Sequence, residues 1–195
     1  GHPAATGTRP DPGSAAAAKP SSGQPDFGPN VLIFDPSMST SQIQAAVDAV
    51  AAQQVPNQFG TQRYALLFRP GTYGTATDPL NFQVGYYTSV AGLGREPGDV
   101  TVNGSIYVRN QCVPGFCVAL NNFWRSLSNL TIDVDTPNFG CYTGEFWPVS
   151  QAAPMRRVHV NGLTTLMDYC TGPSFASGGF IADSRFDGSV VINGS

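Results

Sequence analysis

The fold is decided by residues 64–108, which read YALLFRPGTYGTATDPLNFQVGYYTSVAGLGREPGDVTVNGSIYV. Short apolar runs alternate here with tight turns such as Pro70-Gly71, Asp78-Pro79 and Asn103-Gly104. Strands this short cannot bury their apolar side chains alone. They can do so when each strand stacks on an equivalent strand one coil later. The stretch therefore predicts the first full coil of an all-β, right-handed parallel β-helix, which the later chain repeats.

The composition agrees with a turn-rich β protein, because only 12% of the 195 residues are charged while 22 are glycine and 16 are proline. The net charge is −3, and the 10 basic residues are scattered along the chain. This distribution offers no basic patch, so we expect no nucleic-acid partner. No apolar run approaches the roughly 20 residues that a membrane span needs, so we expect no membrane partner either.

The four cysteines, Cys112, Cys117, Cys141 and Cys170, form an even set. Their spacing is not the paired C-x-x-C of a zinc site, and the chain has only two histidines. We therefore expect two disulfides in a secreted, extracellular protein, with no metal and no cofactor. A Val-Pro-Gly-Phe turn can bring Cys112 and Cys117 together, and Cys141 precedes Cys170 by 29 residues, about one coil. Buried free thiols are the alternative.

The beginning of the chain divides into a tail and a cap. Residues 1–29 are rich in Pro, Ala, Gly and Ser, which is typical of a tail or linker. The following SQIQAAVDAVAAQQ predicts a helix, because Ile43, Val47 and Val50 fall on one stripe. Ser39 or Thr40 can cap its amides. One amphipathic helix ahead of a strand solenoid is expected to cover the open first coil.

The repeat is continued by the strand centres Ile106, Ile132, Val158 and Ile181, which follow one another in steps of 26, 26 and 23 residues. These steps are typical β-helix coil lengths. The sequence then stops at a turn without a feature that resembles a terminal cap, which would leave an open strand edge. We therefore expect residues 30–195 to be the N-terminal portion of a longer β-helix domain, with the remaining C-terminal part of the same protein as its partner.

Several motifs resemble known protein families. Residues 67–74 (LFRPGTYG), 91–94 (AGLG) and 100–104 (VTVNG) resemble the opening coils of the pectate-lyase-like β-helix superfamily. Residues 122–131 (NFWRSLSNLT) and 146–157 (FWPVSQAAPMRR) resemble secreted family 55 glycoside hydrolases, exo-acting β-1,3-glucanases with two β-helices side by side. The resemblance spans about residues 30–195. It implies an inverting glycoside hydrolase whose substrate is a polysaccharide, a β-1,3-glucan. One departure is that FDPSMS stands at residues 34–39, where many such proteins carry Gly-Asp-Gly-x-x-Asp-Asp.

Inverting hydrolysis of a glycoside needs a proton donor and a base, with the two carboxyls roughly 6.5–9.5 Å apart. The candidate carboxyls on the repeat are those of Asp133, Glu145, Asp168 and Asp183, although an Asp at a turn more often caps the backbone. Glu145 lies beside Phe146-Trp147, and Asp168 lies in an apolar segment with Tyr169. We expect Glu145, Trp147, Asp168 and Tyr169 to bind the substrate.

The resemblance implies that the catalytic acid lies later in the protein, so this chain is expected to position water instead. The candidates are Gln151, Ser174 and Ser177, because both serines follow Gln151 by about one coil. A neutral amide and a hydroxyl can hold a water without adding charge. Hydrogen bonding within turns is the alternative role of these residues. The other aromatic residues, including Trp124, are assigned to core packing, and His159 is interpreted as structural.

The leading hypothesis is a secreted glucanase. The enzymatic alternatives on the same fold are an α-glucanase and a polysaccharide lyase. A lyase would need clustered Asp residues for Ca²⁺ and a nearby basic residue, and no such cluster stands out. A non-catalytic carbohydrate-binding or adhesion module is the alternative outside enzymes.

Overall fold

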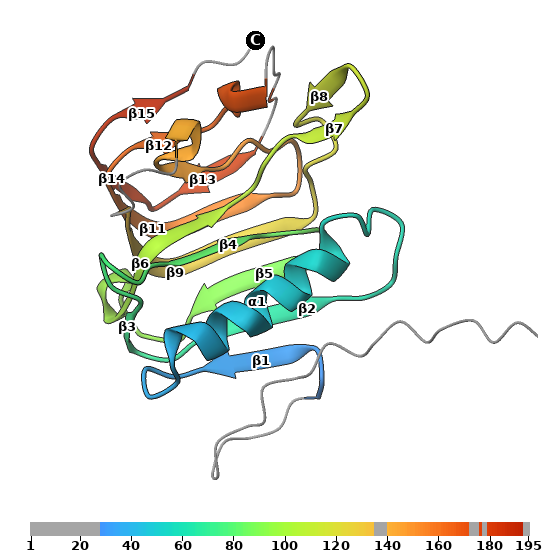
Figure 1. Cartoon of the computed structure of the whole chain (residues 1–195). Coiled ribbons are helices and arrows are strands. Elements are labelled where there is room, and N and C mark those ends of the chain that lie inside the picture. Colours follow the sequence, from blue (N-terminus) through green and yellow to red (C-terminus); the bar gives the residue numbers. More distant parts are fainter. Residues whose placement is uncertain (1–27, 135–139, 172–175, 177–178, 193–195) are drawn as a thin grey trace, which may run out of the picture.

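The computed structural model describes residues 28–134, 140–171, 176 and 179–192, which form a parallel β-solenoid with one α-helix against its first coils (Figure 1). The fold class predicted from the sequence is thereby confirmed. Residues 1–27 of the predicted tail lie outside the described part. The elements are β1 (Val31–Phe34), α1 (Thr40–Gln54), β2 (Tyr64–Phe68), β3 (Gly71–Tyr73), β4 (Leu80–Gln83), β5 (Thr88–Gly92), β6 (Val100–Tyr107), β7 (Gln111–Val113), β8 (Phe116–Val118), β9 (Arg125–Asp133), β10 (Glu145–Phe146), β11 (Pro154–Asn161), β12 (Thr164–Thr165), β13 (Phe180–Ala182), β14 (Arg185–Asp187) and β15 (Val190–Val191), with short 3-10 turns at Pro97–Asp99, Gly140–Tyr142 and Tyr169–Thr171.

One face of the solenoid is a sheet in the order β1-β2-β5-β9-β11-β13, and every neighbouring pair in it is parallel. A second face continues through β10, β12 and β15, which are also parallel. The strand β6 connects two faces, since its first half pairs with β3 and its second half with β4. Successive coils therefore bury each other's apolar side chains, as a solenoid requires.

The corners between faces are made by residues in the left-handed backbone region. Gly104 divides β6 with a φ of +145°, and Asn129, Arg157 and Asp183 occupy an equivalent corner in three successive coils with φ between +50° and +54°. The side-chain amide of Asn129 donates to the carbonyls of Gly92 and Gly94, at 2.9 and 2.7 Å. Asparagine tolerates this conformation because its short polar side chain bonds locally.

The predicted coil boundaries and register are partly wrong. Tyr64 pairs with Thr88 and Thr88 with Arg125, so residues 64–108 contain one full coil and the first part of the next, and β1 precedes them as the first strand. Ile106 pairs with Phe82 on another face and not with Ile132. In the later coils the partners are Ile132 with Val160 and Met155 with Ile181. The left-handed corners inside β6, β9 and β11 cause these shifts, because each corner changes the face to which the following residues belong.

The helix α1 covers the first coils, as predicted. Ser39 caps it, since its hydroxyl accepts a hydrogen bond from the Gln42 amide. Ile43, Val47 and Val50 are buried in the core. The Gln44 side chain bonds both backbone groups of Asn81, with its Nε2 2.6 Å from the carbonyl and its Oε1 3.3 Å from the amide. The helix thus supplies hydrogen-bond partners to Asn81 in β4, a strand that among the described elements pairs with β6 alone.

Both predicted disulfides are present. Cys112–Cys117 closes the hairpin of β7 and β8, and Cys141–Cys170 joins two coils. The last described coil exposes apolar side chains, namely Phe180, Ile181, Val190 and Ile192. No helix in the described part of the chain is long and apolar enough to cross a membrane.

Candidate functional site

The candidate site lies where three successive coils turn into β5, β9 and β11. Tyr87, Trp124 and Ala152 stand at these turns, each with φ between +53° and +56°. Their backbones are joined from coil to coil, because the Tyr87 amide donates to the Trp124 carbonyl at 2.5 Å and the Arg125 amide donates to the Ala152 carbonyl at 3.2 Å. Trp124 and Ala152 are exposed at these turns, and Tyr87 is half-buried.

A depression of about 580 Å³ opens beside these turns. The indole of Trp124 is 55% exposed within it, and Gln151 is also exposed there. A second depression of about 400 Å³ adjoins the first and shares Trp124 and Ala152 with it. The first depression is lined by Leu120, Phe123, Trp124, Ser150, Gln151 and Ala152, none of which carries a carboxyl group.

The buried side chain of Arg125 stabilises the turns through hydrogen bonds to their backbone. Its guanidinium is buried, with Nη1 donating to the Val84 carbonyl at 2.7 Å and Nε donating to the Phe123 carbonyl at 3.2 Å. It also lies over the ring of Tyr86, 4.6 Å from the centroid. Burial lowers the pKa of Arg125 to about 10, so the side chain stays charged at neutral pH. The Arg125 guanidinium therefore links the turns of two coils, those that contain Val84 and Phe123, next to Trp124.

Glu145 and Trp147, which were predicted to bind substrate, lie inside the solenoid instead. Both are at most 1% exposed. A carboxyl oxygen of Glu145 accepts a hydrogen bond from the Ile106 amide at 3.0 Å, and the Trp147 indole donates to the Ala153 carbonyl at 3.2 Å. The segment is covered by residues 120–122, since Asn122 donates to the Pro148 carbonyl. Their assignment as substrate contacts is wrong, because neither side chain has surface to offer.

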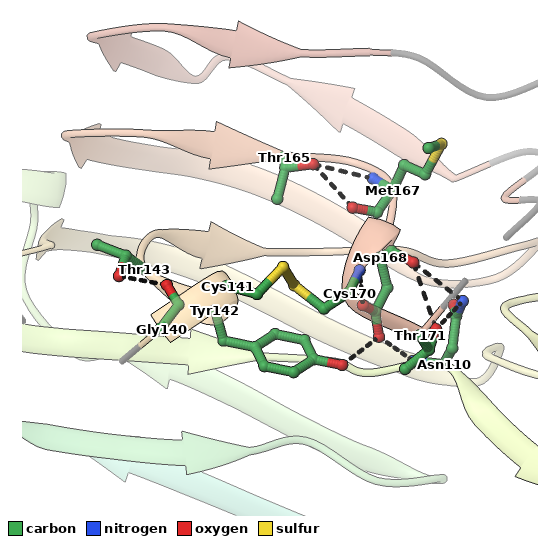
Figure 2. The surroundings of a disulfide bond; sticks show 10 residues. All are labelled: Asn110, Gly140, Cys141, Tyr142, Thr143, Thr165, Met167, Asp168, Cys170 and Thr171. Carbon is green, nitrogen blue, oxygen red and sulfur yellow. Dashed lines mark hydrogen bonds between the residues drawn. A yellow bond between two sulfur atoms is a disulfide. The ribbon is translucent and has the colours of Figure 1, made fainter. Parts of the chain in front are cut away.

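Asp168 is likewise an internal backbone acceptor and not a substrate contact (Figure 2). Its Oδ2 accepts from the Asn110 amide at 2.9 Å and from the Tyr142 hydroxyl at 3.1 Å, and its Oδ1 accepts from the Cys170 amide at 3.1 Å. These bonds fix the ends of the Cys141–Cys170 disulfide in place. Tyr169 is 39% exposed and packs on Phe146 with the ring centroids 5.7 Å apart, so its role in substrate binding stays a prediction.

The remaining candidates divide into three groups. Gln151 lines the first depression, as its predicted role requires, whereas Ser174 and Ser177 lie outside the described residues.

The Asp133 carboxylate accepts from the Asn161 amide side chain, and Asp183 is exposed at a corner. His159 bonds Asp187 at 2.6 Å on the outer surface, which agrees with its structural interpretation.

The buried carboxyl of Glu145 leads to a prediction about pH. Burial raises its pKa well above the ordinary value of 4.5, and the bond from the Ile106 amide only partly opposes this. Above pH 4.5 the unfolded chain therefore loses a proton that the folded chain keeps. We expect the free energy of unfolding to fall as the pH rises above about 4.5, the ordinary pKa of the carboxyl in the unfolded chain, by up to about 1.4 kcal/mol per pH unit.

The measurement is urea denaturation across that pH range, with Glu145→Gln as the matched variant. The glutamine keeps an acceptor for the Ile106 amide but has no titrating proton. The difference in stability between variant and wild type should grow in favour of the variant as the pH rises. A difference that does not change with pH would contradict the protonated state of Glu145.

The assignment of Trp124 to core packing is wrong, because its side chain is 55% exposed, whereas Trp147 is buried. The position of Trp124 indicates this exposure. Trp124 follows Asn122-Phe123 and directly precedes the strand that begins at Arg125, so it lies in a turn and not inside a strand. An aromatic residue outside the alternating pattern of a strand is less constrained to face the core.

The chain is similar over most of its length to known glucanases. No protein-family model matches the chain. The chain is 50% identical over 175 residues to an exo-β-1,3-glucanase of Streptomyces sp. (strain SirexAA-E / ActE), which covers 90% of this chain and 26% of that protein. The structure of sacteLam55A from Streptomyces sp. SirexAA-E matches with a TM-score of 0.72 and 49% identity, over 85% of this chain and 27% of the other. A variant of sacteLam55A in complex with glucose matches with a TM-score of 0.71 and 48% identity, over 86% and 27% of the two chains.

The resemblance to exo-β-1,3-glucanases that the sequence motifs predicted is confirmed by these matches. The chain spans about 26% of the length of the relative it matches. The two disulfides are in addition typical of extracellular proteins.

Proposed function

We propose that this chain, which is half identical to part of an exo-β-1,3-glucanase, belongs to a secreted glycoside hydrolase that acts from the end of a β-1,3-glucan. The observation that carries the proposal is the depression at the left-handed turns, with the exposed indole of Trp124 beside Gln151. The chain contributes a solenoid and part of the substrate groove to that enzyme.

The chemistry of the depression suits a sugar. The faces of a glucose ring carry C–H groups that pack on an indole, while its hydroxyls require polar partners at the edges. Gln151 supplies such a partner, and its amide can both donate to and accept from a water molecule. In an inverting glycosidase that water attacks the anomeric carbon. We assign Gln151 to positioning this water.

The acid and base are supplied by other parts of the protein in this proposal. None of the residues that line the depression has a carboxyl, and the nearest candidates in the sequence, Glu145 and Asp168, are buried acceptors. The exposed apolar side chains of β13 and β15 offer a stacking surface for a further part of the same protein, for which the length of the relative leaves room. Residues 30–195 then form the N-terminal portion of a longer β-helix domain.

The experiment measures sugar release by the whole protein from laminarin, pectin and an α-1,3-glucan. We expect glucose from laminarin alone, first detected by NMR as the α-anomer because inversion changes the β configuration. Release from α-1,3-glucan or an unsaturated product from pectin would replace the proposal by an α-glucanase or a lyase. In the described part of the chain, no three His, Cys, Asp or Glu side chains gather in a way that could hold a metal ion.

A non-catalytic carbohydrate-binding module is the second candidate. The observation in its favour is the same depression, which has an exposed aromatic and no carboxyl. Binding of laminarin by the whole protein without release of any sugar would select this function over hydrolysis.

A further inference from the structure

The second depression, of about 400 Å³, extends away from the first across the starts of β2, β5 and β9. Trp124 and Ala152 line both depressions, so a ligand chain can pass from one to the other along the indole. The second depression is lined by Arg63, Tyr64, Tyr87, Ser89, Trp124, Arg125, Ser126, Ala152 and Pro154.

Tyr87 forms an aromatic wall of the second depression, and contacts within the chain hold its side chain in place. The Tyr87 hydroxyl donates to the Gln58 carbonyl at 2.6 Å, and the guanidinium of Arg63 lies 3.6 Å from the centroid of the Tyr87 ring. Arg63 is itself fixed, because its Nη1 donates to the carbonyls of Gly60 and Gln62 at 3.1 Å. A wall with preset side chains loses little entropy when it binds.

The floor carries hydroxyl groups in register. Ser89 in β5 pairs with Ser126 in β9, which places the two hydroxyls on neighbouring strands of one face. Each can donate one hydrogen bond and accept others. The lining includes no carboxyl, and its exposed cation is the stacked Arg63. Such a surface fits a neutral ligand with many hydroxyls, since an acidic polysaccharide would need several cations.

We propose that the second depression is a subsite for the sugar units of the glucan that lie beyond those held at Gln151, with Trp124 as the wall between the two sets. The inference rests on the proposed function, and it adds a dependence on chain length. A glucan long enough to fill both depressions gains contacts that a short oligosaccharide lacks. Affinity for long chains is therefore set partly by Arg63 and the two serines.

The test is to fill the depression with Ser89→Trp and to remove its guanidinium with Arg63→Ala. We expect kcat/KM of the whole protein on laminarin to fall about tenfold in each variant, while kcat/KM on laminaribiose stays within about twofold. Thr72→Trp is the matched control, because it places the same indole at an exposed strand position on β3. The control should leave both substrates unaffected.

Two results would overturn the subsite. One is an equal loss on laminarin and laminaribiose, which indicates damage to the shared site, and the other is no loss on either. Calorimetric titration with laminarin measures binding without hydrolysis, so it tests the subsite separately from the proposed enzyme activity. If the protein cleaves no glucan but Ser89→Trp weakens laminarin binding about tenfold, hydrolysis is rejected while the subsite stands.

Discussion

Replacing Gln151 by alanine is expected to lower kcat on laminarin about 100-fold while changing KM less than about twofold. The side chain is exposed at the depression beside Trp124, where its amide can hold a water against a bound sugar. Positioning the attacking group for proton transfer contributes about 10²–10⁴-fold in enzymes, and an interaction made mainly in the transition state changes kcat more than KM. Steady-state kinetics of the whole protein give both constants.

The matched control is Gln42→Ala, which removes an exposed glutamine from α1, far from the depression in the fold. It should leave both constants unchanged. A Gln151→Ala protein with unchanged kcat would reject the water-positioning role. A rise in KM alone would turn Gln151 into an ordinary sugar contact.

Replacing Gly104 by alanine is expected to reduce the free energy of unfolding by about 4 kcal/mol. Gly104 has a φ of +145°, which is costly for a residue with a Cβ. A Cβ built there would lie 2.0 Å from the Leu80 carbonyl oxygen, and backbone cannot move aside as a flexible side chain does. The corner must either open or break the pairing of β6 with β4.

Gly98 provides the comparison within the same chain, because a Cβ there meets no atom within 4 Å and its backbone is not in the left-handed region. Chemical denaturation of both variants measures the difference. Gly98→Ala should lie within about 0.5 kcal/mol of wild type. Equal stability of the two variants would mean that Gly104 is not the corner that fixes the register of β6.

The sequence and the structure agree on where some candidate residues lie. Gln151 was selected from its place on the repeat, and its side chain lines the depression, while its role stays a prediction. Trp147 was selected as an aromatic residue close to the carboxyl of Glu145, yet residues 144–150 are buried without interruption. Sequence patterns assume that a strand has one buried and one exposed face. Here the loop before β9 covers the second face of residues 144–150 as well.

The sequence by itself determined the solenoid, the capping helix and both disulfides. These depend on turn chemistry, on a 3.6-residue apolar stripe and on cysteine spacing, all of which are read over short lengths of chain. Only the tertiary structure decided the register of the coils, the exposure of Trp124 and the burial of Glu145. The reason is that each left-handed corner, at Gly104, Asn129 or Arg157, moves the residues after it to another face, and the contact with the neighbouring coil determines where that corner forms.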